Sequence, residues 1–249
     1  MPDHTPPLYV GYLPLPRQHR QFLAALVPLL FALLLAAAAG LALAQRHPGE
    51  ASWDSATQRT WSGLVLSHPY PMLITDSGDA FLLVGVGKFG VHARVEPHQA
   101  EHRSVRGWLL SRDGRKMIEL DDAPDAVTTL ADDPAASIPE FSTGQPVTLR
   151  GEILDGKCYL GAMKPGDGKA HKACAVLCLN GGLPPMFASF DPPPDGDALS
   201  LLVIDGSTTL TPELLNLVAE PVLIRGTHHR FASLSIINAK ASDIQPLNP

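Results

Sequence analysis

The sequence predicts a mainly β protein with one membrane-spanning helix at its N-terminus. Its 24 prolines and 21 glycines separate short aliphatic and β-branched runs, which is typical of small antiparallel β domains and not of a helical bundle. One uncharged apolar run lies near the N-terminus, and short motifs of the first half recur in the second. These observations predict a membrane anchor followed by two small β domains.

The anchor is predicted over residues 22–44, which read FLAALVPLLFALLLAAAAGLALA. A helix of this length crosses about 30 Å of hydrocarbon. Arg17 and Arg20 precede the run and acidic residues follow it, so the positive-inside rule places the N-terminus in the cytoplasm. We therefore expect a single-pass protein of a bacterial inner membrane with its C-terminal domains in the periplasm. The alternative is a cleaved signal peptide, because Ala42 and Ala44 form a small-x-small cleavage pattern.

The rest of the chain divides by composition. Residues 1–21 are predicted to be a proline-rich cytoplasmic tail that is too short to fold alone, and residues 45–59 to be a linker. A first β domain is expected over residues 60–122 and a second over residues 146–249, joined by an acidic linker at residues 123–145.

Each β domain is predicted to be a small OB-like barrel. Both contain five strand-like runs in series, and Asp113-Gly114 between two alternating runs predicts a hairpin in the first. In the second, Thr211 as N-cap and Pro212 at the first helical position predict a short helix between the third and fourth strands. Five strands with a helix at this place have the order of an OB barrel.

The two domains resemble a duplication. Residues 61–65 (WSGLV) match residues 149–153 (LRGEI), and residues 105–107 (VRG) match residues 224–226 (IRG). Most of the additional length of the second copy is a cysteine-bearing helical insertion and the helix that begins at Pro212. The alternative is a chance match of glycine-containing strands, because identities of this length are weak signals.

The insertion contains the candidate site. All three cysteines and His171 lie between residues 151 and 185. Cys158 follows a strand-like run, whereas His171, Cys174 and Cys178 lie on a predicted short helix that ends at a pair of glycines. At about 100° per residue, these three helical positions share one face.

The insertion also carries a recognisable pattern, which comprises Cys158-Tyr159-Leu160-Gly161, His171, Cys174-Ala175, Cys178, Gly181-Gly182 and Pro184-Pro185. It resembles membrane-anchored or exported bacterial proteins with an OB-like domain that carry C-Y-L-G, H-x2-C-A-x2-C and G-G-x-P-P motifs. The resemblance implies that the four ligand-type residues belong to one site. It implies no particular activity.

Three kinds of site are compatible with these residues. In an oxidising compartment Cys158 would pair with Cys174 or Cys178 in a structural disulfide worth about 2–4 kcal/mol, which leaves one free thiol. Alternatively, Cys158, His171, Cys174 and Cys178 form a Cys3His ligand set that suits tetrahedral zinc, copper or an iron-sulfur cluster. The spacing matches no zinc-ribbon, c-type haem or thioredoxin pattern. A redox-active thiol pair with a lowered cysteine pKa is the third interpretation.

Other chemistry has little support in the sequence. It contains no hydrolase, zinc-protease or nucleotide-binding motif, so we do not expect an enzyme. A net charge of −6 gives no electrostatic reason to bind nucleic acid. His92, His98 and His102 have loop spacing, and we expect them to be solvated and not to join a copper site.

The sequence therefore predicts a membrane-anchored extracytoplasmic accessory or binding protein. We expect it to act in a redox or metalloprotein-associated assembly and to contact another membrane or periplasmic protein. Its Cys/His element is expected to be a structural disulfide or a metal site. The alternative function is that of a periplasmic thiol-redox protein.

Overall fold

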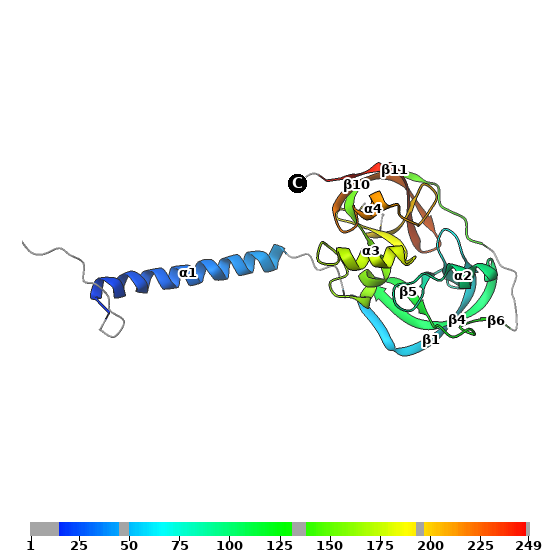
Figure 1. Cartoon of the computed structure of the whole chain (residues 1–249), viewed down its shortest axis with the longest axis horizontal. Helices are drawn as coiled ribbons and strands as arrows, with labels where there is room; N and C mark the ends of the chain where they lie inside the picture. Colours follow the sequence, from blue (N-terminus) through cyan, green and yellow to red (C-terminus); the bar gives the residue numbers. More distant parts are fainter. Residues whose placement is uncertain (1–14, 45–49, 131–137, 193–196, 248–249) are drawn as a thin grey trace, which may run out of the picture. The chain divides into compact units, whose positions relative to one another are not determined.

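The computed structural model describes residues 15–44, 50–130, 138–192 and 197–247. The chain forms two compact units, residues 1–48 and residues 49–249. In the first unit the described structure is a single helix, and the second unit contains all the described strands (Figure 1).

The N-terminal unit contains helix α1 (Arg17–Ala44), which is blue in Figure 1. It is long and apolar enough to cross a membrane, a property that it shares with signal sequences. The helix begins before the predicted span, because no proline follows Pro16 until residue 28 and the Pro16 carbonyl accepts a hydrogen bond from Arg20 N (2.9 Å). The end of the predicted tail is therefore helical, while residues 1–14 lie outside the described residues.

The first barrel is formed by the five strands that the sequence predicts. Strand β1 pairs with β2, β2 with β3, β3 with β5, and β5 with β4, which returns to pair with β1 and closes the barrel. The β3–β5 pairing is parallel and the others are antiparallel. The bounds are β1 (Ser52–Leu66), β2 (Met72–Thr75), β3 (Ala80–Val84), β4 (Glu101–Arg112) and β5 (Arg115–Leu120), with short helices α2 (His92–Val95) and η1 (Glu96–His98) between β3 and β4.

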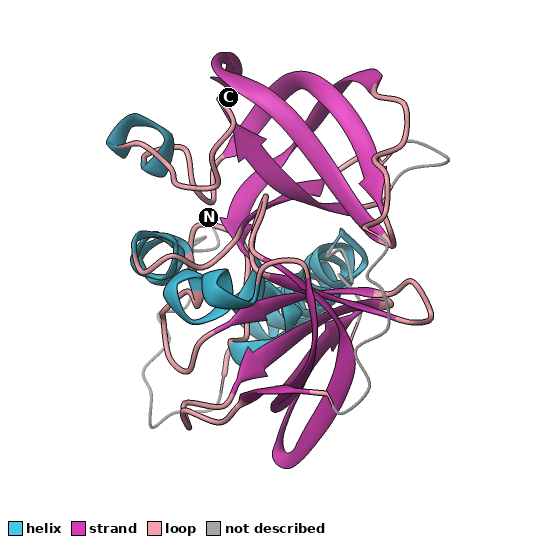
Figure 2. Cartoon of the chain, turned by 90° about the vertical axis from the view of Figure 1, so that its right-hand side faces the viewer, coloured by secondary structure: helices cyan, strands magenta, loops and turns pink. Residues whose placement is uncertain are grey.

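The second barrel repeats this topology. Strands β7 to β11 close in the order β7-β8-β9-β11-β10, and only the pairing of β9 with β11 is parallel. Figure 2 shows the strands of both barrels in magenta. The bounds are β7 (Gln145–Asp155), β8 (Pro185–Ser189), β9 (Leu199–Ile204), β10 (Pro221–Phe231) and β11 (Leu234–Pro246), and the predicted helix α4 (Pro212–Leu215) has Thr211 as its N-cap. The predicted mainly β fold with two OB-like barrels is confirmed.

The glycines of the repeated motifs have the same role in each barrel. A Cβ on Gly63 of β1 would lie 2.2 Å from a carbonyl oxygen of β2, and a Cβ on Gly151 of β7 would lie 2.2 Å from one of β8. Gly107 of β4 and Gly226 of β10 approach β5 and β11 in the same way. These glycines occupy matching strands, which supports the interpretation of the two barrels as a duplication.

Strand β1 begins at Ser52, inside the segment predicted to be a linker. Its first residues pair with the end of β4, from Ser52 opposite Ser111 to Asp54 opposite Leu109, and a bulge separates this part from the pairing that resumes at Arg59. Because most side chains of this extension are polar and exposed, it lacks the hydrophobic alternation by which the other strands were predicted.

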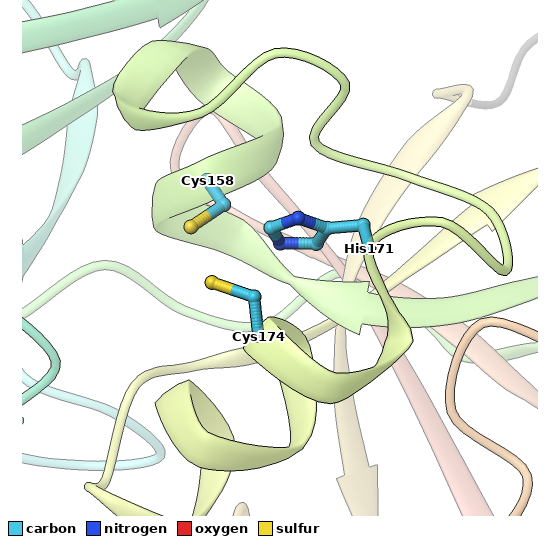
Figure 3. Close-up of side chains that lie close together, drawn as sticks. All are labelled: Cys158, His171 and Cys174. Atoms are coloured by element: carbon cyan, nitrogen blue, oxygen red, sulfur yellow. The ribbon is translucent and has the colours of Figure 1, made fainter.

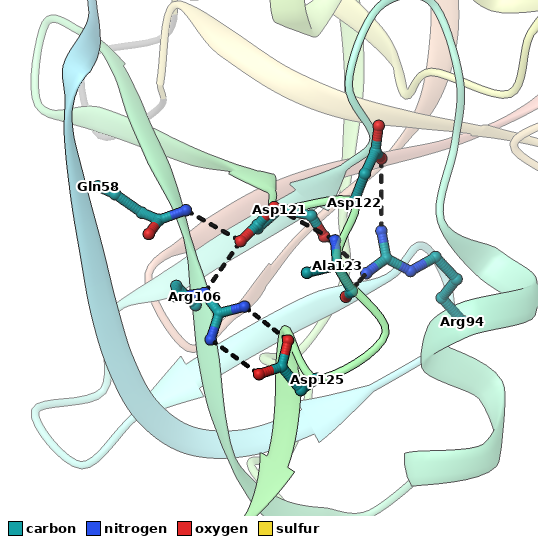
Figure 4. Close-up of polar contacts among 7 residues, drawn as sticks. All are labelled: Gln58, Arg94, Arg106, Asp121, Asp122, Ala123 and Asp125. Carbon is teal, nitrogen blue, oxygen red and sulfur yellow. Dashed lines mark hydrogen bonds and ion pairs between the residues drawn. The ribbon is translucent and has the colours of Figure 1, made fainter.

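The predicted acidic linker also contains ordered structure. Strand β6 (Val127–Thr129) pairs antiparallel with the first part of β4, from Arg103 to Val105. Before it, Arg106 of β4 forms ion pairs with Asp121 (2.9 Å) and Asp125 (2.7 Å), as Figure 4 shows. The guanidinium thus fixes part of the acidic run against the barrel, and residues 131–137 of the predicted linker lie outside the described residues.

Three hydrophobic clusters fill the C-terminal unit. One lies in each barrel, and the third includes residues of both, among them Met117 of β5 and Met186 of β8. Cys158 and Cys178 belong to this third cluster. The cysteine-bearing insertion is therefore part of the core that joins the two barrels.

Candidate functional site

The insertion brings thiols and an imidazole to one point. The ligand atoms of Cys158, His171 and Cys174 all lie within 4.8 Å of one another, and Figure 3 shows these side chains pointing toward a common centre. Asp155, Cys158 and Cys178 form a second group with the same spacing. All four predicted residues thus lie close together, although Cys178 shares a group with Cys158 and not with His171. A cluster of this composition could hold a metal ion.

Asp155 connects two of the predicted residues. It is the last residue of β7, and its Oδ1 accepts a hydrogen bond from Cys158 N (2.8 Å), which begins the π-helical turn η2 (Cys158–Ala162). Its Oδ2 lies 3.0 Å from His171 Nε2. In the tautomer that donates this hydrogen bond from Nε2, the free lone pair of the ring is on Nδ1. The same contact raises the pKa of His171 above its usual value.

Helix α3 (Lys172–Asn180) presents the other two thiols. His171 is its N-cap residue, and Cys174 and Cys178 lie on the same face, as the helical spacing predicts. Cys158 and Cys178 are buried, with exposed fractions of 5% and 1%, whereas Cys174 is partly exposed. Cys174 is therefore the thiol through which solvent can reach the cluster.

Lys88 of the first barrel completes the site, and the sequence analysis did not identify it. Its Nζ donates hydrogen bonds to Cys174 Sγ (2.9 Å) and Cys178 Sγ (3.5 Å). An ammonium group at this distance favours the thiolate form of a cysteine. The glycines at 85, 87 and 90 around it are a sequence signal of a loop, but nothing in the sequence connects that loop with the cysteines.

The cysteine pKa values reflect this arrangement. The Sγ atoms of Cys158 and Cys178 are 4.0 Å apart. A hydrogen bond from Cys158, supported by the nearby Lys88 ammonium, lowers the pKa of Cys178 to about 7 although burial opposes the change. The hydrogen bond to Cys178 and burial raise the pKa of Cys158 far above its usual value. The cluster therefore favours a thiolate at Cys178 and a protonated thiol at Cys158 when no metal is bound.

Lys157 holds the loop that carries Lys88. Its Nζ donates hydrogen bonds to the carbonyls of Gly85 (2.7 Å) and Gly87 (2.8 Å) and forms an ion pair with Glu119 (2.5 Å). Lys157 and Glu119 are both buried. Lys157 directly precedes Cys158 in the insertion. The insertion therefore positions the loop of the first barrel that carries Lys88.

The two glycines after α3 provide the surface on which this loop packs. A Cβ on Gly181 would lie 1.8 Å from the Lys88 carbonyl oxygen, and Gly90 N donates a hydrogen bond to the Gly181 carbonyl (2.8 Å). Gly182 has a φ of +90° and its carbonyl accepts a hydrogen bond from Tyr70 Oη (2.7 Å). The G-G motif is therefore explained by close backbone approach at Gly181 and by a left-handed conformation at Gly182.

The three cysteines are free thiols in the structure. The three histidines expected in a solvated loop lie instead in α2 (His92), η1 (His98) and β4 (His102), and they have separate surroundings. His92 packs edge-on against Tyr70 with ring centroids 4.8 Å apart, His98 lies 3.5 Å from Glu101, and His102 lies 3.9 Å from Asp76. Within the described ranges, the groups suited to a metal are the two that contain Cys158.

The remaining parts of the resembling motifs also lie at the cluster. Ala175 is a buried residue of α3, the Pro184 carbonyl accepts a hydrogen bond from Gly156 N (3.1 Å), and Pro185 pairs with Asp155 in the sheet. No protein-family model, curated protein or solved structure matches the chain.

Proposed function

We propose that this chain is a membrane-anchored extracytoplasmic accessory protein that binds one thiophilic metal ion, zinc or cuprous copper. Cys158, His171 and Cys174 are the primary ligands, and Cys178 is the fourth. The observation that carries the proposal is the convergence of two thiols and an imidazole within 4.8 Å at a largely buried point. Thiolate and imidazole are the ligands that both metals prefer.

The distance between the sulfurs favours a metal over a disulfide. The Sγ atoms of Cys158 and Cys178 are 4.0 Å apart. A disulfide needs about 2.05 Å, whereas two thiolates about 2.3 Å from a tetrahedral metal lie about 3.8 Å from each other. The paired carboxylate of Asp155 supports the same interpretation, because metal-binding histidines commonly donate their second nitrogen to such a group. A disulfide requires neither His171 nor Asp155.

The charge of the surroundings also suits a thiolate-rich metal site. Three thiolates around a divalent ion carry a net negative charge, and the Lys88 ammonium lies beside two of them. It therefore offsets the negative charge of the site, and it contributes to the lowered pKa of Cys178. Because Cys174 is only partly buried, the ion can be exchanged with a partner at this ligand. A partner in the membrane or the periplasm, within a redox or metalloprotein-associated assembly, fits such a role.

Metal analysis of the full-length protein tests the proposal. Protein purified in detergent under reducing conditions should contain close to one equivalent of zinc or copper. His171→Ala should lose the metal while keeping its fold, whereas His98→Ala, a change at a histidine outside the cluster, should retain it. A wild-type protein that binds neither metal after reduction would show that the site has another function.

A structural disulfide or a redox-active thiol pair is the second candidate. It is favoured by the proximity of Cys158 and Cys178 and by the pKa of about 7 at Cys178. Because both sulfurs are buried, a disulfide between them would be structural and would leave Cys174 as the free thiol. A thiol count on denatured, non-reduced protein separates the candidates: one free thiol indicates the disulfide, and three free thiols with bound metal indicate the metal site.

A further inference from the structure

Arg112, at the end of β4, is buried without the partners that a guanidinium needs. Its exposed fraction is 6%, and its Nε and Nη1 atoms have no hydrogen-bond acceptor. Among the described residues, no carboxylate forms an ion pair with it. Buried charged donors that lack acceptors are strongly unfavourable, so such a group points to an acceptor that binds from outside the chain.

Tyr159 of the C-Y-L-G motif holds this side chain in place. The Arg112 guanidinium carbon lies 4.2 Å from the centre of the Tyr159 ring. The stacked ring stabilises the cation, and the Tyr159 hydroxyl takes part in a hydrogen bond with the guanidinium. The contact with Tyr159 therefore fixes the guanidinium, while its Nε and Nη1 are left without an acceptor.

Arg112 faces a cavity with a second cation. The cavity has a volume of about 520 Å³ and is lined by Glu50, Ala51, Ser52, Arg112 and Lys164. Lys164 and Glu50 are exposed, so the two cations outnumber the single carboxylate at the mouth. A volume of this size admits a phosphate group together with part of the molecule that carries it.

We propose that this cavity binds a phosphate group, with Arg112 and Lys164 as the two positive charges that attract it. The group is either free phosphate or the phosphate of an anionic lipid headgroup. The second source is relevant because the cavity wall begins at Glu50, and α1 ends at Ala44. The site is separate from the Cys/His cluster and does not depend on bound metal.

Thermal unfolding of the full-length protein in detergent tests this site. Inorganic phosphate, or micelles containing phosphatidylglycerol, should raise the unfolding temperature saturably, because a ligand that binds only the folded state stabilises it. Stabilisation by phosphate identifies the free anion, and stabilisation by phosphatidylglycerol alone identifies the lipid. Phosphatidylcholine micelles and chloride at equal ionic strength are the controls. If neither phosphate nor phosphatidylglycerol stabilises the protein, the proposal is wrong.

Substitutions in the cavity test whether phosphate binds at Arg112. Arg112→Gln should weaken the apparent affinity by about tenfold or more, and Lys164→Gln by about threefold. Arg150→Gln removes an arginine that is 61% exposed and should change nothing. An equal loss in Arg150→Gln would indicate non-specific charge attraction. If Arg112→Gln does not fold, the weaker phosphate binding expected of Lys164→Gln tests the site instead. Phosphate binding seen only in Glu50→Gln would contradict the proposal, because it would show that Glu50 is the natural partner of Arg112.

Discussion

Replacing Gly181 by alanine should alter the cysteine chemistry without touching any ligand. The alanine Cβ would lie 1.8 Å from the Lys88 carbonyl oxygen, so the two segments must separate by more than ~1 Å. The φ of Gly181 is −78°, a value that alanine adopts without strain. Any effect of the substitution therefore comes from displacing the loop that carries Lys88, and overpacking of this kind costs about 1–3 kcal/mol.

The expected result is a less acidic thiol. At pH 7, a cysteine with the pKa of about 7 that Cys178 has is about half thiolate. At the ordinary value of about 8.5 the thiolate fraction falls to about 3%. The hydrogen bond from Cys158 is the larger cause of the lowered pKa and remains, so loss of the Lys88 contacts should move Cys178 a smaller part of the way between these limits and lower its thiolate fraction accordingly. Ultraviolet thiolate absorbance of the reduced, metal-free protein, followed against pH, measures this change.

Gly168→Ala is the matched control. Gly168 has a φ of +69° and nothing lies within 4 Å of its added Cβ, so alanine there introduces backbone strain without displacing a neighbour. It should reduce stability by about 1 kcal/mol and leave the thiol titration unchanged. If Gly181→Ala is destabilised but its thiols titrate like those of the wild type, the Gly181 contact does not control the position of the Lys88 ammonium.

Three further predictions concern charges at the same cluster. The pKa of Cys178 is lowered to about 7, so its thiolate stabilises the fold above about pH 8.5, and this contribution is lost as the pH falls through 7. The difference in unfolding free energy between the reduced wild type and Cys178→Ser should therefore grow from pH 7 to pH 8.5. A difference that stays constant over this range would contradict the prediction. Lys157→Met leaves Glu119 buried without its cation and should cost about 3–5 kcal/mol in chemical denaturation, whereas a loss below about 1 kcal/mol would show that the ion pair does not hold the loop. Asp155→Asn removes the carboxylate that orients His171 and should weaken metal affinity about 10- to 100-fold in competition with a chelator; unchanged affinity would show that Asp155 does not support a metal ligand.

The parts of the fold that could be predicted from sequence are those with a local signal. Strands with alternating apolar residues, the Asp113-Gly114 hairpin and the Thr211-capped helix all follow from such patterns and were predicted. The extension of β1 before Arg59 and the short strand β6 were missed, because their residues are mostly polar and they form only by pairing with β4.

The candidate site was predictable only in part for a similar reason. Cys158, His171, Cys174 and Cys178 lie within one short segment, so their proximity follows from helical spacing and a turn. Lys88 lies 86 residues before Cys174, and its contact depends on how the two barrels pack. Asp155 was overlooked although it precedes Cys158 by three residues, because a carboxylate at a strand end has many structural roles.

The position of Lys88 shows what the first barrel contributes. Every thiol and the imidazole belong to the insertion of the second barrel, so that barrel alone contains the proposed ligands. The positive charge beside the thiols is the ammonium of Lys88, which belongs to the first barrel. Lys157 and Gly181 of the insertion contact the loop that carries Lys88 and hold it in position. Because Cys158 and Cys178 also belong to the hydrophobic cluster between the barrels, packing and thiol acidity depend on the same contacts. A substitution that separates the barrels should therefore change the thiol titration before it unfolds either one.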